Sequence, residues 1–260
     1  MNAEFQVRGI STGIIRPGDD IVSVLIAALS RTNDAIIEGD IIIIAESALA
    51  TAEGRLINLG EVTPSIKAAA LADEFGMDPR EVEVVIRESD SIVGGISGFL
   101  LCMKNGTLLP NAGVDASNAP PGHLVPLPRD PDASADRIRK EIFTRCNVHT
   151  GVIVADSRTH AMRVGCSGVA IGCAGMPSII DDRGRSDLFG RKLLVTKRAL
   201  ADNIATAAEL VMGEADECTP IAIMRGLGIP LSEEVGVEEI DAEECLFMGT
   251  LRNISKKENE

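Results

Sequence analysis

Apolar residues recur with helical spacing in several segments, and short apolar runs typical of buried strands lie between them. Segment 21–31 predicts a helix after the Pro17-Gly18 turn, with Asp19 or Asp20 as its N-cap. Segment 40–45 contains four consecutive isoleucines after Gly39, which is typical of a buried strand. Further helices are predicted at 63–75, 78–88, 134–144 and 199–212, and further strands at 151–155, 193–196 and 221–224.

The middle of the chain predicts a hairpin followed by a long irregular stretch. Lys104-Asn105-Gly106 separates the apolar runs 98–103 and 107–109, a strong hairpin signal. Residues 110–132 are rich in Pro, Gly, Asn and Asp, which is typical of a linker or an active-site loop.

Helices and strands alternate irregularly along the chain, which favours a mixed α/β (α+β) fold over a doubly wound sheet. We expect one catalytic unit over residues 5–250, with two lobes joined through the loop 110–132 as the alternative. The acidic segment from Ser232 onward is expected to become helical, and residues 251–260 form a frayed tail.

The composition of the chain argues against binding to nucleic acid or to membranes. The formal net charge of −14 repels a phosphate backbone, and the absence of Tyr and Trp removes the usual stacking platforms, so nucleic acid and anionic membranes are not expected partners. No targeting segment stands out and no apolar run could span a bilayer, so we expect a cytoplasmic protein. The six cysteines form no C-x-x-C pair and are expected to be free thiols.

Asp115 and Asp156 are the first acidic residues whose positions suggest chemistry. Asp115 lies just after the hairpin among amide and carboxylate side chains that suit a hard cation. Taken alone, the residue is better explained by an Asx-turn in a surface loop, since Asp and Asn are common turn residues. Asp156-Ser157 follows a buried strand, where open α/β sheets bind ligands. A simple turn or a helix N-cap remains open there.

A second acidic cluster follows the helix that ends near Met212. Glu214, Asp216 and Glu217 lie at the helix end that carries partial negative charge, so a bound divalent cation would explain them. A solvated acidic loop is the alternative.

Five arginines lie close together in the sequence, which is unusual for so acidic a chain. They could bind phosphate groups, or they could form ion pairs with nearby acidic residues. They are Arg158, Arg163, Arg183, Arg185 and Arg191. The small-residue run 165–175 does not fit the G-x-G-x-x-G motif and is equally explained by close packing.

A set of short motifs runs in fixed order from about Gly9 to about Gly226. They are Ala52-Glu-Gly-Arg55, Asn111-Ala-Gly-Val-Asp-Ala-Ser-Asn118, Asp156-Ser157, Asp187-Leu-Phe-Gly-Arg191, and Met212-Gly-Glu-Ala-Asp-Glu217 with Pro220 and Arg225-Gly226 after it. In these motifs the chain resembles the coenzyme F420 gamma-glutamyl ligases, and the Asn-Ala-Gly-x-Asp-Ala-Ser-Asn segment is the most specific of them.

The resemblance implies an F420 ligase-type fold, an intertwined homodimer, and a GTP-dependent ligase that joins L-glutamate to the deazaflavin coenzyme precursor through an acyl phosphate. It implies two divalent cations, Mn or Mg, with a monovalent cation as a further candidate. Asp115 and Asp156 would be catalytic and would bind metal together with Ser157 and Glu214. The nucleotide would be bound by Thr51, Asn118, Arg163, Arg191 and Asp216.

The chain also departs from the family pattern. Thr51 stands where the family's Ser-Lys-Ala-Glu-Gly motif has a lysine that meets the nucleotide, and 159–163 keeps only the last arginine of Gly-Arg-Pro-Phe-Arg. A related ligase with another carboxylate acceptor, or a non-catalytic metal- or nucleotide-binding relative, therefore remain alternatives. The acceptor, the number of glutamates added, GTP against ATP, and the metal are left open.

Overall fold

The computed structural model describes residues 4–250 and has the predicted mixed α/β character. Within it the chain forms two compact units, one of residues 4–57 and 116–237 and the other of residues 58–115 and 238–250. No helix among the described residues is long and apolar enough to cross a membrane. The predicted frayed tail, 251–260, lies outside the described residues.

The first unit is built on a five-stranded sheet with the order β1-β12-β2-β8-β9. Only β2 and β8 are parallel, and the other neighbouring pairs are antiparallel. The sheet therefore is mixed, as the irregular order of elements predicts. Its strands are β1 (Gln6–Ile10), β2 (Ile41–Ala45), β8 (Gly151–Thr159), β9 (Cys166–Ala174) and β12 (Ile221–Arg225).

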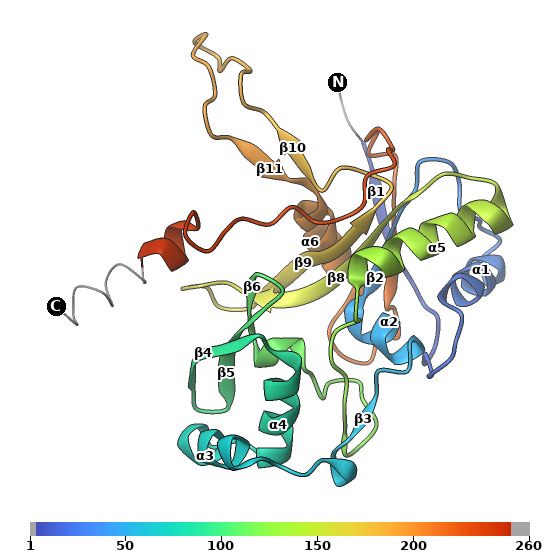
Figure 1. Ribbon diagram of the computed structural model, residues 1–260. Coiled ribbons are helices and arrows are strands. Elements are labelled where there is room, and N and C mark those ends of the chain that lie inside the picture. Colours follow the sequence, from blue (N-terminus) through green and yellow to red (C-terminus); the bar gives the residue numbers. More distant parts are fainter. Residues whose placement is uncertain (1–3, 251–260) are drawn as a thin grey trace. The chain divides into compact units, whose positions relative to one another are not determined.

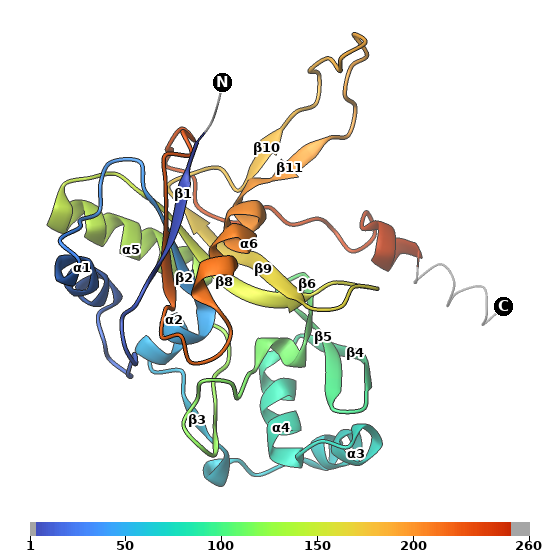
Figure 2. The same ribbon diagram turned by 180° about the vertical axis from the view of Figure 1, so that it is seen from behind.

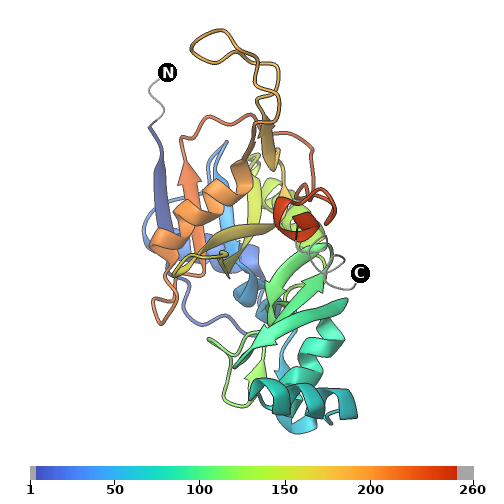
Figure 3. The same cartoon turned by 90° about the vertical axis from the view of Figure 1, so that its left-hand side faces the viewer.

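Helices cover both faces of this sheet, and the alternation of strand side chains explains how (Figures 1 and 2). Ile42 and Ile44 face the core under α1 (Ile21–Arg31), α2 (Glu46–Ala52) and α5 (Pro131–Cys146). Ile41 and Ile43 face the core under α6 (Leu200–Met212), the orange helix that lies across the strands in Figure 3. Because both faces are buried, β2 is apolar at nearly every position.

Most predicted helices are confirmed, with shifted ends. Asp20 is the N-cap of α1, and its Oδ1 accepts from Ser23 N at 2.5 Å. The helix predicted at 63–75 begins only at Ile66, because the Ser65 hydroxyl caps it. The helix predicted at 134–144 extends to Pro131–Cys146, from Asp130 as its N-cap to a left-handed residue after its end.

The strand predicted at 193–196 is wrong. The strand here is β11 (Lys197–Ala199), which pairs with β10 (Ile179–Asp181). The apolar residues that suggested a strand, Leu194 and Val195, are exposed on the arm formed by residues 182–196, which projects beyond β10 and β11 (Figure 1). The Asp182 carboxylate pairs with Arg185 and Arg198 and holds the base of the arm.

The second unit contains α3 (Ile66–Phe75), α4 (Pro79–Glu88) and the antiparallel sheet β4-β5-β6. The predicted hairpin is confirmed as β5 (Phe99–Lys104) and β6 (Thr107–Pro110), and β4 (Ser91–Ile96) is an additional strand. Short elements complete the fold: β3 (Ile57–Asn58), the 3-10 turns η1 (Leu59–Glu61) and η2 (Asn111–Gly113), and β7 (His123–Leu124).

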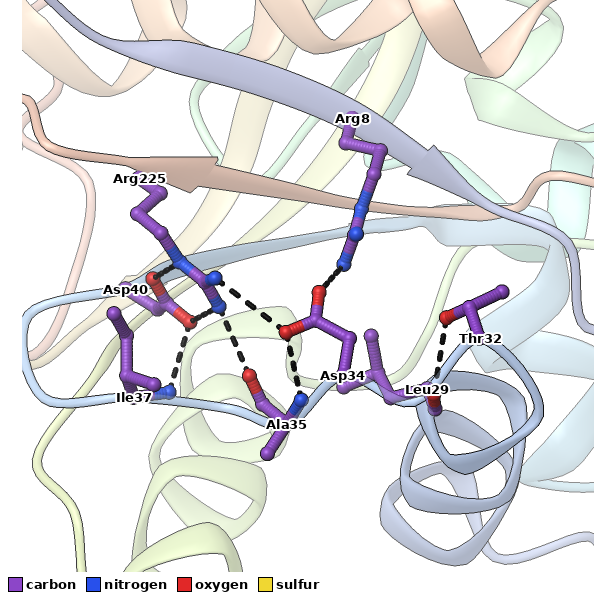
Figure 4. A network of polar contacts seen from close by, with 8 residues as sticks. All are labelled: Arg8, Leu29, Thr32, Asp34, Ala35, Ile37, Asp40 and Arg225. Carbon is purple, nitrogen blue, oxygen red and sulfur yellow. Dashed lines mark hydrogen bonds and ion pairs between the residues drawn. The ribbon is translucent and has the colours of Figure 1, made fainter.

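A network of salt bridges connects β1, β12 and the segment that precedes β2 (Figure 4). The fully buried Asp40 carboxylate accepts from Arg225 Nε at 2.8 Å and from Nη2 at 2.7 Å. Arg225 also donates to the Ala35 carbonyl and reaches Asp34, which binds Arg8 of β1. A buried carboxylate without such a partner would be strongly destabilising, so Arg225 holds β12 beside the entrance to β2.

Candidate metal site

Asp156 and Ser157 follow the buried part of β8 and point to opposite faces of the sheet, since side chains alternate along a strand. Ile153 and Ala155 pack into the core under α6, so Ser157 continues that face. Val152 and Val154 pack into the core under α2 and α5, so Asp156 continues the opposite face. Asp156 and Ser157 therefore place one oxygen atom that could bind a cation on each face of the sheet.

Ser157 contacts Glu214, another of the predicted metal ligands. The Ser157 hydroxyl donates to Glu214 Oε2 at 3.1 Å, although the residues are 57 positions apart. Glu214 is placed by Gly213, whose φ of +75° ends α6. Both side chains are exposed, so their oxygen atoms are accessible to a cation and to further ligands.

Two residues that the sequence did not single out complete this cluster. The ligand atoms of Cys166, Glu209 and Glu214 all lie within 4.8 Å of one another. Cys166 begins β9 opposite Thr159, and Glu209 lies on the last turns of α6. Partial burial, followed by the negative charges of Glu214 and Glu209, raises the pKa of the Cys166 thiol. No local motif predicts this grouping, because it depends on the register of β8 with β9.

Asp156 is held by an ion pair on its own strand. Its Oδ2 accepts from Arg158 Nε at 2.7 Å, and both side chains are 13% exposed. Arg183 likewise pairs with Asp181, lowering the pKa of that carboxyl to about 2 chiefly through the guanidinium hydrogen bond. For Arg158, Arg183 and Arg185 the structure thus supports the explanation that the arginines balance nearby acids.

Arg163 and Arg191 lie in a different situation, on exposed segments of the first unit. Arg163 belongs to the loop between β8 and β9, and Arg191 belongs to the arm, where its backbone N donates to Asp187 Oδ1 at 2.9 Å. Figure 1 shows this loop and the arm leaving the sheet in different directions.

The remaining predicted nucleotide residues lie on three separate segments. Thr51 is in the last turn of α2, half-buried, and its carbonyl accepts from Gly54 N. Asn118 has a left-handed backbone, with φ of +55°, in an exposed loop. Asp216 is exposed in the acidic turn after α6, where Glu217 accepts from Ala215 N at 2.8 Å. Glu217 therefore closes the turn.

Asp115 belongs to the second unit and follows an unusual backbone segment. Asn111, Ala112 and Gly113 have consecutive positive φ values of 48°, 54° and 70°. Asn111 Oδ1 accepts from Leu100 N at 2.9 Å, and Ala112 is fully buried, so the neighbouring strand fixes this shape. Strained conformations held by their surroundings cluster at functional sites, which agrees with a functional role for the exposed Asp115.

The chain is similar to known proteins over most of its length. Residues 9–226 match the model of the family described as F420-0:gamma-glutamyl ligase. A coenzyme F420:L-glutamate ligase of Methanopyrus kandleri is 47% identical over 82% of this chain and 83% of its own length. Proteins of the same name are 41% identical in Methanothermobacter thermautotrophicus, over 82% of this chain and 85% of that protein, and 39% identical in Methanocaldococcus jannaschii, over 92% and 94%.

Proposed function

The chain belongs to the F420-0:gamma-glutamyl ligase family, and from this we propose that it forms an amide bond between L-glutamate and the deazaflavin coenzyme precursor. The observation that carries the proposal is the match over residues 9–226 together with relatives named coenzyme F420:L-glutamate ligase. The contact between Ser157 and Glu214 supports it, since both residues are implied metal ligands.

Amide formation needs an activated carboxylate, because a carboxylate and an amine do not condense in water. In the proposed reaction, a carboxylate oxygen of the coenzyme precursor attacks the γ-phosphorus of GTP, and GDP leaves. The amine of L-glutamate then attacks the acyl carbon, inorganic phosphate leaves, and the amine proton passes to solvent. No nucleophilic side chain is required, so positioning and electrostatics supply most of the catalysis.

Four residues are proposed to hold the two divalent cations of the reaction: Asp115, Asp156, Ser157 and Glu214. Bound cations would neutralise the crowded phosphates. The structure offers suitable donors, because Ser157 and Glu214 present exposed oxygen atoms to one another and Asp156 presents another on the opposite face of β8. Arg158 orients the Asp156 carboxylate through the 2.7 Å hydrogen bond. A monovalent cation is a further candidate for this oxygen-rich site.

For the nucleotide we propose binding by Asn118, Asp216, Arg163 and Arg191, with Thr51 beside the phosphates. The family lysine is absent at Thr51, so another cation has to supply that charge. Arg163 and Arg191 are the candidates, because the other arginines of the predicted cluster pair with acids. A guanidinium group also binds phosphate in a bidentate manner, whereas an ammonium group acts as a point charge.

A homodimer is the proposed assembly. The arm exposes four large apolar side chains, Leu188, Phe189, Leu194 and Val195, each at least 79% accessible to solvent. Contiguous exposed apolar residues are typical of protein interfaces. Arg191 lies on the same arm, so a dimer that covers the arm would also change the surroundings of this guanidinium.

A product assay tests the proposed function. The pure protein is incubated with the coenzyme precursor, L-glutamate and Mn²⁺, with GTP or ATP in parallel, and the products are weighed by mass spectrometry. We expect a mass gain of whole glutamyl units with release of nucleoside diphosphate. Nucleotide hydrolysis with no glutamyl product would instead support a related ligase with another acceptor. Absence of both reactions, with nucleotide binding retained, would support a non-catalytic relative.

A further inference from the structure

A small pocket lies between the end of β1 and the last turn of α1 in the first unit. Residues 8–11 line one side of it, and Ala28, Arg31 and Thr32 line the other. Its volume is about 190 Å³, whereas pockets for drug-sized ligands measure roughly 300–1,000 Å³. At about 30 Å³ per water molecule, it holds a ligand of about six waters in size. The pocket therefore suits a small ion or an amino acid rather than a whole nucleotide.

Two arginines and no acidic residue line this pocket, although acidic residues outnumber basic residues in the chain by 39 to 25. Arg31 Nη2 donates to the Ser11 carbonyl at 2.8 Å. Arg8 points from β1 toward Asp34 and pairs with it (Figure 4). Within residues 4–250 each of the two arginines has a single acceptor group. A guanidinium group carries more N–H donors than one acceptor can use, so further donors are available to a ligand.

The positive charge around the pocket exceeds the negative charge. Asp34 and Asp40 form salt bridges with Arg8 and Arg225. Arg31 contacts no acidic side chain in the part of the chain that the structure describes. One guanidinium charge is therefore left to attract an anion, in a chain whose net charge is −14.

The helix dipole does not account for the position of the Arg31 side chain. A cation is favourable near the C-terminal end of a helix, and Arg31 lies in the last turn of α1. However, the Leu29 and Ser30 carbonyls at this end already accept hydrogen bonds from the backbone N–H groups that follow the helix. Arg31 extends instead to Ser11, and its side chain thereby connects the two sides of the pocket.

We propose that this pocket binds a small oxyanion, a phosphate or a carboxylate, through the guanidinium groups of Arg8 and Arg31. Guanidinium groups bind both kinds of oxyanion in a bidentate manner. Ser11 lines the same side of the pocket as Arg8 and carries a hydroxyl that can donate a further hydrogen bond. Both arginines are exposed, so an anion can reach them from solvent.

This site goes beyond the proposed function and does not depend on it. Among the molecules of the proposed reaction, L-glutamate and inorganic phosphate carry an oxyanion and are small enough for the pocket. GTP and the coenzyme precursor are too large for its volume of about 190 Å³. Neither arginine belongs to the residues proposed above to bind the nucleotide or the divalent cations.

Calorimetric titration of the full-length protein with inorganic phosphate tests the proposal, with EDTA present so that no divalent cation holds the anion. We expect one saturable site per chain in the wild type. Arg31→Ala should weaken binding by at least about tenfold, the scale of a lost hydrogen bond to a charged group. Arg31→Lys keeps the charge but not the bidentate geometry, so its affinity should lie between the two. The control, Arg129→Ala, removes an exposed arginine of the same unit outside the pocket and should bind phosphate as the wild type does.

Competition with L-glutamate identifies the oxyanion that the pocket prefers. Displacement of phosphate by L-glutamate would assign a carboxylate ligand, and undiminished phosphate binding would assign phosphate. No saturable binding of either anion, or equal binding by the wild type and Arg31→Ala, would overturn the proposal, and so would displacement of phosphate by GTP in EDTA. Thermal melts of each variant verify that the fold is intact. The product assay tests the ligase activity separately, so either conclusion can fail without the other.

Discussion

Arg225, Glu53 and Asn111 all lie in segments that the family resemblance matched, yet their side chains serve the fold. Arg225 pairs with the buried Asp40. Glu53 Oε1 accepts from Ser134 Oγ at 2.6 Å and from Arg137 at 2.7 Å, which connects the end of α2 to the start of α5. Asn111 supports β5. A matched segment therefore contains residues that stabilise the fold beside residues with a proposed role in the reaction. Only the contacts in the structure distinguish the two kinds.

The first prediction concerns Asp40. Asp40→Ala should lower the free energy of unfolding by about 3 kcal/mol, the lower end of the cost of breaking a buried ion pair, because Arg225 is partly exposed and can recruit water. Urea denaturation measures the change. Arg8→Ala removes an exposed ion pair of the same network and should cost less than about 1 kcal/mol. Equal losses for both variants would contradict the structural role of Asp40.

The second prediction concerns Thr51, which stands where the family motif has a lysine. Arg191→Ala should weaken GTP binding by about 1.5–3 kcal/mol, the scale of a hydrogen bond to a charged group. Thr51→Lys should leave nucleotide affinity unchanged or improve it. Calorimetric titration with GTP and ATP in the presence of Mn²⁺ measures both effects, with Arg183→Ala as the control because Arg183 already pairs with Asp181. A wild type that binds neither nucleotide, together with a Thr51→Lys variant that binds GTP, would contradict the ligase assignment.

At this scale the sequence predicts individual site residues, whereas their neighbours depend on the fold. The family pattern implies a metal role for Ser157 and Glu214, and the structure places the two in contact, while the metal role stays a prediction. Cys166 and Glu209 could not be predicted, since their position beside Glu214 depends on strand register and helix packing. The arginine cluster was ambiguous because sequence distance does not reveal which acid each guanidinium reaches.

Among elements, the strongly periodic helices and the isoleucine-rich strand were predictable, and β9 was not. Its run of small residues resembles a loop, and the structure explains why it is a strand. A Cβ at Gly168 would meet α6 on one face, and a Cβ at Gly172 would lie 2.5 Å from the backbone of Pro131 on the other. The close-packing explanation of the run 165–175 is therefore confirmed. Glycine lowers strand propensity but permits helices to pack on both faces.

The element-scale prediction tests this packing. Gly168→Ala should destabilise the protein by about 1–3 kcal/mol, the usual cost of overpacking, because the new methyl group meets the Ala205 backbone rather than a flexible side chain. Thermal or urea unfolding measures it. Gly94→Ala is the matched control, since it lies in a strand with no atom within 4 Å of the added methyl group. A Gly168→Ala protein as stable as the control would contradict the close approach of α6 to β9.

At the scale of the whole molecule, charge constrains function. If the chain, with its net charge of −14, acts on GTP and a carboxylate acceptor as proposed, repulsion between these anions has to be overcome. Bound divalent cations would neutralise part of this negative charge. We therefore expect excess EDTA, which removes the divalent metal, to weaken GTP binding by at least about tenfold, and added Mn²⁺ to restore it. Calorimetry measures the affinity, and added NaCl at matched ionic strength is the control. Undiminished GTP binding in EDTA would contradict a metal-assisted nucleotide site.

The last prediction concerns assembly. The proposed homodimer should have twice the 27.4 kDa monomer mass in light scattering at micromolar concentration. Leu188 and Phe189 are 99% and 87% exposed on the arm, and apolar side chains so exposed favour burial in an interface by roughly 1.5–3 kcal/mol each. Replacing both with serine should therefore shift the protein toward the monomer. Ile66→Ser, which removes a 92% exposed residue of α3, is the control and should leave the mass unchanged. A wild type that is monomeric at this concentration would refute the homodimer, and a double variant that remains fully dimeric would show that the arm is not its interface.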